Sequence, residues 1–329
     1  MDAKITKTRI AHMLSYDWLK IVGLALALIL FWNLVFTTTA TRVRPSQQFT
    51  VFNHQANRVL SEDFFNDLGN ALESGTFSYE VIETTTADLA TTGEYVSILI
   101  DSRLQINEGD VIFIPKLADP STAYEDEENG ETKYELNYLQ SFLRRNQTYL
   151  YDLDPDKEGG YFYELKAYLN GYYGDYHNAE TIDEEKIEKD FRDRAKKNKD
   201  KRFKTEEQLA LGAEKEIERI GKYRDALIKL EGFLASGIVA FEEVEAESLQ
   251  YQYQGKYALN ICPDEDTMGE MKKYASYAET GVDQDGKETL RNTAKDMCVM
   301  FFDTKGTEES FEYESLLYVV HLIEECVAA

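Results

Sequence analysis

The chain has 329 residues and a formal net charge of −25 at pH 7. This length allows one large domain or two small ones with a real hydrophobic core. So acidic a composition excludes nucleic acid as a partner, because its phosphate groups would be repelled. Three cysteines, Cys262, Cys298 and Cys326, are too few for a disulfide scaffold and lack the spacing of a metal site. One bridge with one free thiol remains open, as does no bridge, and we expect neither a metal nor a cofactor.

A long apolar segment, Trp18–Phe36, lies near the N-terminus and has Lys20 as its one charged residue. A helix of this length covers about the thickness of a hydrocarbon core and satisfies its own backbone hydrogen bonds. Trp18 and Trp32 lie toward its ends, where amphipathic rings favour the membrane interface. The segment is therefore predicted to span a membrane. A buried core helix and a signal peptide cleaved near residues 38–40 are the alternatives.

Basic residues indicate how this segment is oriented. Lys4, Lys7 and Arg9 precede it, whereas Arg42 and Arg44 follow it. Because basic flanks are retained in the cytoplasm, we expect a single-pass protein of the cell membrane with a cytoplasmic N-terminus and an extracellular C-terminal domain. The predicted segments are a cytoplasmic N-terminus (1–17), a transmembrane helix (18–36), a linker (37–46), an α/β ectodomain (47–180 and 233–329) and a charged helical hairpin inserted into it (181–232).

The first part of the ectodomain alternates strand-like and helix-like patterns. The expected elements are a strand at 48–52, a helix from Ser61 to Gly75, a strand at 79–83, a threonine-rich loop at 84–93, a helix at 95–105 ending before Gly109, and a strand at 111–114. Strands alternating with helices predict a parallel sheet with right-handed crossovers. The third strand is apolar throughout, which is typical of a strand covered on both faces.

These segments also resemble a known family. The successive stretches FFNDLGNALES, YEVIETTTADL and VSILIDSRLQINEGDVIFIPK are similar to the start of a type II periplasmic-binding-protein-like domain, the solute-binding protein of carbohydrate ABC importers. Arg103, Gly109 and the run from Asp110 to Phe113 match the helix-Gly-strand step of that family. Weaker similarity covers the helix and strand at 138–154, the returning strand at 255–260 and the late helix at 311–320.

The chain departs from that family in two respects. No Cys lies near residues 36–46, where a lipoprotein would carry its lipid, and the middle of the chain is too short for a full second lobe. The resemblance is therefore to a single-lobe, membrane-anchored protein of the kind found in Firmicutes. It implies an accessory component of an ABC carbohydrate importer, with a permease and a carbohydrate as partners. The alternative is a cell-envelope interaction module that binds proteins and no small molecule.

The segment 181–232 has the pattern of two charged helices. Thr205, followed by Gln208 three residues later, is a credible start for the second helix. One stripe of that helix is apolar and consists of Ile217, Ile220, Tyr223, Leu227 and Leu230. A packing seam and a docking face for a partner protein are the two interpretations of this stripe.

Aromatic residues are concentrated between positions 161 and 176, which hold seven aromatics in sixteen residues. Sugar rings stack on aromatic rings, so this stretch is the candidate carbohydrate site. The candidate ligand-binding residues are Tyr161, Tyr163, Tyr172, Tyr173 and Tyr176. The alternative is a helix that packs on the sheet, with tyrosine hydroxyls reaching water.

Residues 192–204 carry eight basic and two acidic side chains in an otherwise acidic ectodomain. This segment is the candidate partner-binding surface, for an anionic envelope polymer, lipid headgroups or an acidic protein. The candidate residues are Arg192, Arg194, Lys196, Lys197 and Arg202. The alternative is an exposed turn between two helices.

Two other patterns bear on chemistry. Asp152, Asp154 and Asp156 alternate as in a calcium loop, but position six of that loop is Lys157, so a solvated acidic turn is preferred. The four histidines are scattered, and no nucleophile, zinc or phosphate-binding motif occurs. We therefore predict no catalytic residue and no enzyme activity.

Overall fold

The computed structural model describes residues 7–39, 43–44, 47–58, 63–89, 95–126, 132–247, 252–282, 288–304 and 313–327. The chain forms two compact units, Met1–Val43 and Arg44–Ala329. The predicted helix start at Ser61 lies outside the described residues.

The first unit is a helix, α1 (Lys7–Thr39). Its apolar stretch Trp18–Phe36 is long and apolar enough to cross a membrane, and none of it is buried inside the protein. The helix extends beyond the predicted segment on both sides, so the first three residues of the predicted linker are helical. Exposed leucine, isoleucine and phenylalanine side chains around its whole circumference are what a lipid-facing helix carries.

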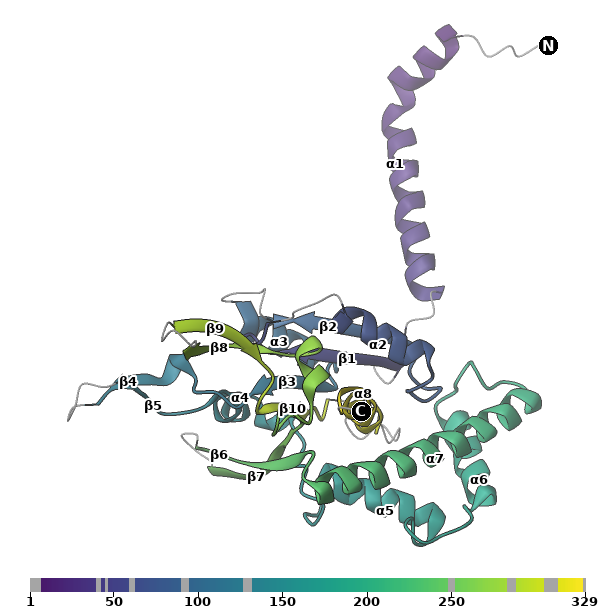
Figure 1. Ribbon diagram of the computed structural model, residues 1–329. Helices are drawn as coiled ribbons and strands as arrows, with labels where there is room; N and C mark the ends of the chain where they lie inside the picture. The colour runs from purple at the N-terminus through teal and green to yellow at the C-terminus, as the bar shows by residue number, and fades with distance from the viewer. Residues whose placement is uncertain are drawn as a thin grey trace. The chain divides into compact units, whose positions relative to one another are not determined.

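The second unit contains a six-stranded sheet in the order β2-β1-β3-β10-β7-β6 (Figure 1). The strands are β1 (Gln48–Asn53), β2 (Glu83–Asp88), β3 (Val111–Pro115), β6 (Ala240–Glu247), β7 (Gln252–Asn260) and β10 (Met297–Phe301). The first three strands are parallel, as predicted. β10 is antiparallel to both β3 and β7, and β6 is antiparallel to β7. The sheet is therefore mixed, and the prediction of a wholly parallel sheet is wrong for its second half.

The second predicted strand lies at the wrong position. Residues 79–82 are not in a strand, and β2 is the segment expected to be a threonine-rich loop, paired with β1 from Glu83 to Asp88. Threonine is β-branched and favours strands, and an edge strand tolerates its hydroxyl groups. The Tyr79 hydroxyl instead donates to Glu216, and the Glu80 carboxylate accepts from Arg202, so these polar groups hold the segment away from the sheet.

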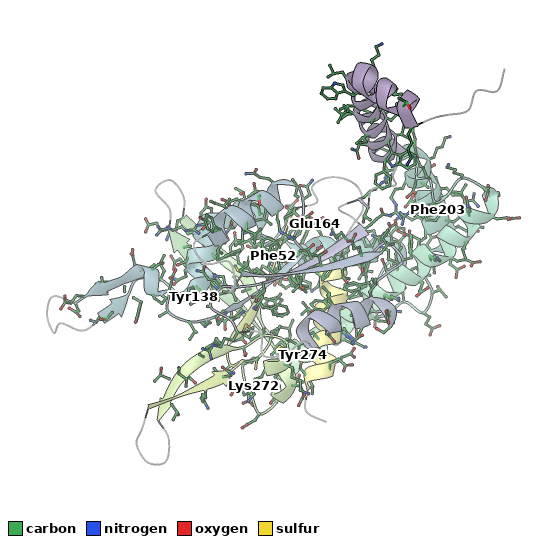
Figure 2. The ribbon with its side chains drawn as sticks, turned by 90° about the horizontal axis from the view of Figure 1, so that it is seen from above. Phe52, Tyr138, Glu164, Phe203, Lys272 and Tyr274 are labelled. Atoms are coloured by element: carbon green, nitrogen blue, oxygen red, sulfur yellow. The ribbon has the colours of Figure 1, made fainter. Side chains whose placement is uncertain are left out.

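Helices cover both faces of the sheet. The helices on one face are α2 (Asp63–Glu73), α5 (Tyr161–Tyr173), α7 (Glu206–Ser236) and α8 (Glu314–Cys326), and those on the other are α3 (Val96–Gln105) and α4 (Tyr138–Asn146). Strand residues alternate between these two cores, with Val111 and Phe113 on the first side and Ile112 and Ile114 on the second. Figure 2 shows Phe52 in the interior, with Tyr138 on one side of it and Phe203 on the other.

Two helices occupy the segment 181–232, as predicted: α6 (Glu184–Lys197) and the first part of α7. Thr205 forms a capping box with Gln208, which confirms the predicted start of α7. Four members of the predicted stripe are buried, and Ile217 packs against them, so the stripe is a packing seam within the main core. That the pair is an insertion into a solute-binding lobe remains a prediction.

The remaining elements are small. Two hairpins, β4–β5 (Ala123–Glu125 and Thr132–Tyr134) and β8–β9 (Tyr277–Val282 and Glu288–Thr293), extend from the body of the unit (Figure 1). Short 3₁₀ helices lie at Pro120–Thr122 (η4), Gln147–Tyr149 (η5) and Gly269–Lys273 (η6). The three cysteines are buried and carry free thiols.

Candidate functional site

The order of the first three strands creates a crevice at one edge of the sheet. The chain passes from β1 to β2 on one side and then returns through α3 to β3 on the other side. In open α/β sheets, ligands bind outside the carboxyl ends of the strands where the chain changes direction in this way. Here that point lies beyond Asn53 of β1 and Pro115 of β3.

Asparagine side chains fix the wall of this crevice. Asn53 donates from Nδ2 to Asp88 Oδ1 at the end of β2, at 3.0 Å. Asn57 donates to Asn53 Oδ1 at 3.0 Å and to the Phe113 carbonyl at 2.8 Å, and all three residues are buried. The backbone N–H of His54 donates to the same carbonyl at 3.0 Å. These bonds hold the segment after β1 in one conformation, so the crevice is preorganised.

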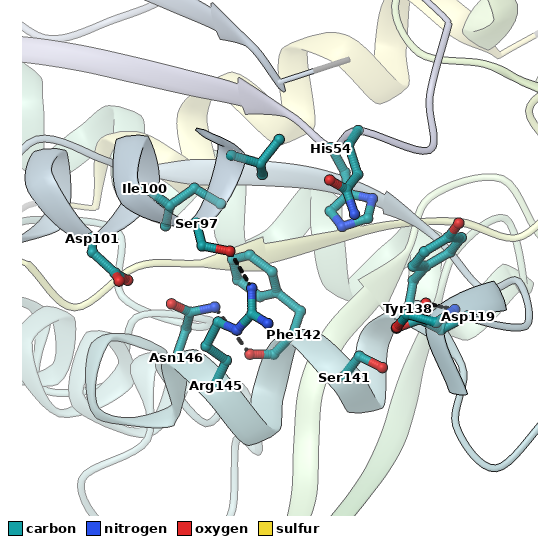
Figure 3. Close-up of a pocket in the computed structure, with 13 residues that line it drawn as sticks. His54, Ser97, Ile100, Asp101, Asp119, Tyr138, Ser141, Phe142, Arg145 and Asn146 are labelled. Carbon is teal, nitrogen blue, oxygen red and sulfur yellow. Dashed lines mark hydrogen bonds between the residues drawn. The ribbon is translucent and has the colours of Figure 1, made fainter. Parts of the chain in front are cut away.

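The crevice is a pocket of about 90 Å³ (Figure 3). It is lined by His54, Gln55, Val96, Ser97, Ile100, Asp101, Asp119, Ser121, Tyr138, Ser141, Phe142, Arg145 and Asn146. The start of α3 forms one wall and α4 another. The His54 ring lies 5.0 Å from the Tyr138 ring and 6.2 Å from the Phe142 ring, between centroids, so one side of the pocket is aromatic.

His54 is a neutral group in this pocket at pH 7. Burial lowers the pKa of its imidazole to about 4, although the nearby Asp119 charge acts in the opposite direction. His54 Nδ1 accepts a hydrogen bond from the Ala56 amide at 3.2 Å. The proton of the neutral ring is therefore on Nε2, which can act as a donor.

Asp119 supplies a negative charge beside this ring. Burial alone would raise the pKa of its carboxyl, but the nearby hydroxyls of Ser141 and Ser121 and the Ser121 amide hold it below the usual range. Its Oδ1 accepts from the Ser121 amide at 2.9 Å and the Ser121 hydroxyl at 2.7 Å. The carboxylate is thus ionised at neutral pH and held in one orientation.

The opposite wall carries a cation. Arg145 Nη1 donates to the Ser97 hydroxyl at 2.5 Å, which joins the start of α3 to α4. Asp101 lies one helical turn beyond Ser97 on the same side. Together the pocket offers a neutral donor, two carboxylates, a guanidinium and an aromatic surface. This combination suits a small polar ligand with several hydroxyl groups. Among the described residues, no group of three or more His, Cys, Asp or Glu side chains is arranged to hold a metal ion.

The predicted tyrosine site lies elsewhere, on and just after α5. Tyr161 and Tyr176 are buried, and Tyr163 is 38% exposed. Tyr161 packs against Phe301 and Tyr313 in the main core, with ring centroids 4.9 and 5.3 Å apart. None of the five tyrosines lines the pocket at the strand ends. Carbohydrate binding by these residues remains a prediction.

Three of the predicted tyrosines, Tyr172, Tyr173 and Tyr176, contact side chains of α6 and α7. Tyr172 donates to Asp190 of α6 at 3.1 Å, and its ring lies beneath the Lys186 ammonium group. Tyr176 donates to Glu231 of α7 at 3.0 Å. The Arg224 guanidinium lies 4.7 Å from the centroid of the Tyr173 ring. These contacts join α5 to α6 and α7.

The predicted basic surface divides into paired and exposed members. Arg192 pairs with Glu188 and Glu206, and Arg194 pairs with Glu216 at 2.8 Å. Arg202 pairs with Glu80 and Asp200, both at 2.8 Å. The side chains of Lys196 and Lys197 are exposed. Whether any of the five binds a partner remains a prediction.

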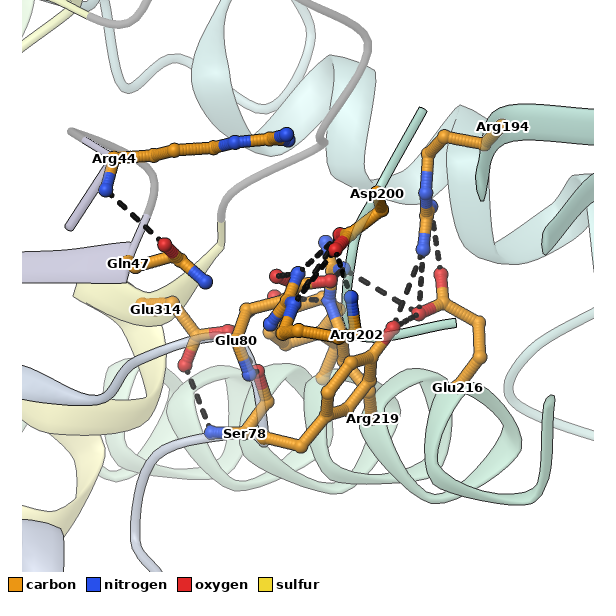
Figure 4. Close-up of polar contacts among 12 residues, drawn as sticks. Arg44, Gln47, Ser78, Glu80, Arg194, Asp200, Arg202, Glu216, Arg219 and Glu314 are labelled. Atoms are coloured by element: carbon orange, nitrogen blue, oxygen red, sulfur yellow. Dashed lines mark hydrogen bonds and ion pairs between the residues drawn. The ribbon is translucent and has the colours of Figure 1, made fainter. Parts of the chain in front are cut away.

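Two of these arginines, Arg194 and Arg202, belong to a largely buried polar network (Figure 4). Its centre is Arg219, which is 1% exposed and donates from Nε to the Tyr223 hydroxyl at 2.8 Å. Tyr223 in turn donates to Glu314 of α8 at 2.6 Å, and Glu314 also accepts from the Ser78 hydroxyl at 2.6 Å. Glu216 accepts from Arg194 and from the Tyr79 hydroxyl. The network connects the loop before β2 with α6, α7 and α8.

The acidic turn at 152–156 is stabilised by lysines. Asp152 pairs with Lys157 at 2.6 Å, and Asp154 pairs with Lys256 at 3.0 Å. Asp152 and Asp154 also accept from the backbone amides two residues later, as in Asx turns. This arrangement agrees with the preferred interpretation of a solvated turn.

Sequence reasoning missed the pocket residues. His54 was considered only as one of four scattered histidines, and Asp119, Tyr138 and Arg145 lie far from it in the chain. One signal was present, since Asn53 and His54 follow directly after a correctly predicted strand. Comparisons with protein-family models, curated proteins and solved structures gave no match for this chain, so its function must be argued from its own residues.

Proposed function

We propose that this chain is a membrane-anchored solute-binding protein whose ligand is a small polyhydroxylated molecule, and that it serves a carbohydrate ABC importer. The observation that carries the proposal is the pocket at the carboxyl ends of β1 and β3. It has neutral and charged donors, carboxylate acceptors and an aromatic side within about 90 Å³. Hydroxyl groups of a sugar both donate and accept, so they can satisfy His54, Asp119 and Arg145 together.

Anchoring by α1 supports the importer half of the proposal. A tethered protein has an effective concentration in roughly the millimolar range near its membrane partner, so weak docking to a permease suffices. Alkaline carbonate should leave the full-length chain in membranes, and protease added outside cells should remove the ectodomain. Extraction by carbonate, or protection of the ectodomain in intact cells, would contradict the anchor or its orientation.

Ligand binding is tested with the full-length chain in nanodiscs against a panel of monosaccharides and polyols. A ligand of this pocket should raise the unfolding temperature as its concentration increases. At a free ligand concentration of 100 times Kd, the native state should be stabilised by about 2.7 kcal/mol. Asp119→Asn should reduce the shift at each ligand concentration, whereas Tyr163→Phe on α5 should preserve it. A shift that is lost only in the α5 variant would move the site to the tyrosines.

A protein-interaction module is the second candidate, and the β4–β5 hairpin favours it. Tyr124 and Tyr134 on this hairpin are 51% and 47% exposed, and tyrosine is enriched at protein interfaces. Crosslinking in cells from position 124 would distinguish the two candidates. A specific crosslinked protein, together with no ligand response, would favour the interaction module.

A further inference from the structure

The turn between α6 and α7 presents several lysines to solvent. Lys196, Lys199, Lys201 and Lys204 are exposed, and residues 192–204 carry a net charge of +6. Residues 1–44 carry six basic and two acidic side chains, a net charge of +4. Because the whole chain has a net charge of −25, residues 45–329 have a net charge of −29. The turn is therefore a local positive surface on a strongly negative domain.

Ion pairs within the domain fix the position of this surface. Arg202 pairs with Glu80 and Asp200, and its guanidinium lies 5.2 Å from the centroid of the Phe203 ring. Phe203 packs against Phe191 of α6, with ring centroids 4.9 Å apart. The acidic residues Asp193, Asp200, Glu206 and Glu207 are also in or beside the turn. Of these, Asp200 pairs with Arg202, and Glu206 pairs with Arg192.

The same turn lies beside the point where the chain enters the domain (Figure 4). The Arg44 amide donates to Gln47 Oε1 at 3.1 Å, and the Ile82 amide donates to the Gln47 carbonyl at 2.9 Å. Two residues before Ile82, Glu80 holds Arg202 of the turn. Burial alone would raise the pKa of Asp200, but Arg202 and the positive charge of Arg44 hold it below its usual range, so Arg44 is near the turn.

The length of the connecting chain limits how far this region can be from a membrane. Seven residues, 37–43, lie between Phe36, the end of the apolar stretch, and Arg44. Even fully extended they reach at most about 28 Å. Lys199 and Lys201 flank Asp200, the turn residue near Arg44, so they are within reach of the headgroups of any bilayer that α1 crosses.

We propose that the lysine-rich α6–α7 turn binds anionic phospholipid headgroups of the bilayer that holds α1. The inference rests on the proposed membrane anchor, but not on solute binding. Clusters of basic residues close to a membrane helix are attracted to anionic lipid, whereas the remaining acidic surface is repelled. This opposition orients the domain, with the turn toward the membrane and the acidic surface away from it.

The test uses the full-length chain in nanodiscs with a fluorophore on Asn198→Cys and an acceptor dye on lipid headgroups. The native thiols should remain unlabelled, because burial raises the pKa of Cys262 to about 12 and that of Cys298 well above its usual value. We expect energy transfer at least twofold higher with phosphatidylglycerol than with phosphatidylcholine. The difference should disappear in 0.5 M salt, because exposed charges are then screened.

A matched pair of variants isolates the lysines. The combined change Lys196→Gln, Lys199→Gln, Lys201→Gln and Lys204→Gln should abolish the lipid dependence. A control that removes the same charge elsewhere, at Lys133, Lys229, Lys273 and Lys295, should preserve it. Transfer that is equal in both lipids, or unchanged by the first variant, overturns the proposal.

The outcomes also separate this inference from the proposed function. Failure of the chain to enter nanodiscs would overturn both the anchor and this inference. A chain that enters nanodiscs, without lipid-dependent transfer, would overturn only the inference. Binding of the turn to an acidic protein would appear as equal transfer in both lipids that changes when that protein is added.

Discussion

Two polar regions toward opposite ends of the second unit, Arg44–Ala329, differ in how their polar groups are satisfied. In Figure 2 the label Tyr138 shows where the pocket lies, and the label Phe203 shows where the arginine network lies. In the network, Arg219, Glu216 and Glu314 are buried, and each has a partner within the protein. In the pocket, His54, Asp119 and Arg145 border a cavity. The comparison indicates that polar groups satisfied by the protein contribute stability, whereas polar groups around a cavity are available to a ligand.

The largest expected effect is at the centre of the network. Arg219→Ala should destabilise the protein by about 3–5 kcal/mol, because it removes a fully buried guanidinium that donates to Tyr223 and pairs with Glu216, and leaves a cavity in its place. Chemical denaturation measures this. Arg192→Ala, which removes a surface pair with Glu188, should cost less than about 1 kcal/mol. Equal costs for the two variants would contradict the distinction between the regions.

The two regions should lose stability in different pH ranges. Burial alone would raise the pKa of Glu216, but Arg219 and Arg194 lower it to about 2, so its contribution is present above the unfolded value near 4.5 and is lost as pH falls to about 2. Burial lowers the pKa of His54 to about 4, so below pH 6.5 the unfolded state gains a proton that the native state does not, and stability falls until about pH 4. Each contribution is roughly 3 kcal/mol.

Substitution separates these two ranges. His54→Asn should flatten the loss of stability between pH 6.5 and 4, and Glu216→Gln should flatten the loss below about 4.5. Denaturation midpoints measured from pH 7 to 3 are the readout. A His54→Asn variant with the wild-type pH profile would show that this imidazole is not buried in its neutral form.

A smaller effect is expected at the pocket. Asp119→Asn should weaken binding of the pocket ligand by about 10- to 100-fold, because hydrogen bonds to charged groups contribute about 1.5–3 kcal/mol. Isothermal titration with the ligand found in the nanodisc screen measures this. If the variant loses as much folding stability as binding free energy, Asp119 stabilises the fold and does not contact the ligand.

The smallest effect tests packing beside the network. A Cβ at Gly212 would collide with the Phe191 and Phe203 rings, so Gly212→Ala should cost about 1–3 kcal/mol. Gly221, on the same helix, has open space around it, so Gly221→Ala should stabilise by roughly 0.5–1 kcal/mol. Thermal denaturation compares the two. Similar effects would indicate that α6 does not pack closely on α7.

Local patterns predicted part of this fold. β1, β3, α3 and α7 were located because apolar residues recur at the spacing of their buried faces. β2 was misplaced because the three threonines of this edge strand show no apolar pattern. Tyr79 and Val81, by contrast, alternate with polar residues in the way that strand residues do, although they are not in a strand. The antiparallel strands β6, β7 and β10 depend on pairings between distant segments, which spacing within one segment does not encode.

The site was harder to predict than the fold. Its residues come from the segments after β1 and β3, from the start of α3 and from one side of α4 along its length, so only the strand order brings them together. On α5, composition showed many tyrosines but not where their rings point. Tyr161 is buried among other aromatic rings, while Tyr163 two residues later is partly exposed.

The two outermost strands of the sheet differ in how they are protected. β6 carries Glu242, Glu243, Glu245 and Glu247, whereas charges on β2 occur only at its two ends, Glu83 and Asp88. Unpaired strand edges are templates for joining another chain, and charged side chains prevent this. Edge-to-edge aggregation should therefore begin at β2, and acidification that neutralises the glutamates should open a second route through β6.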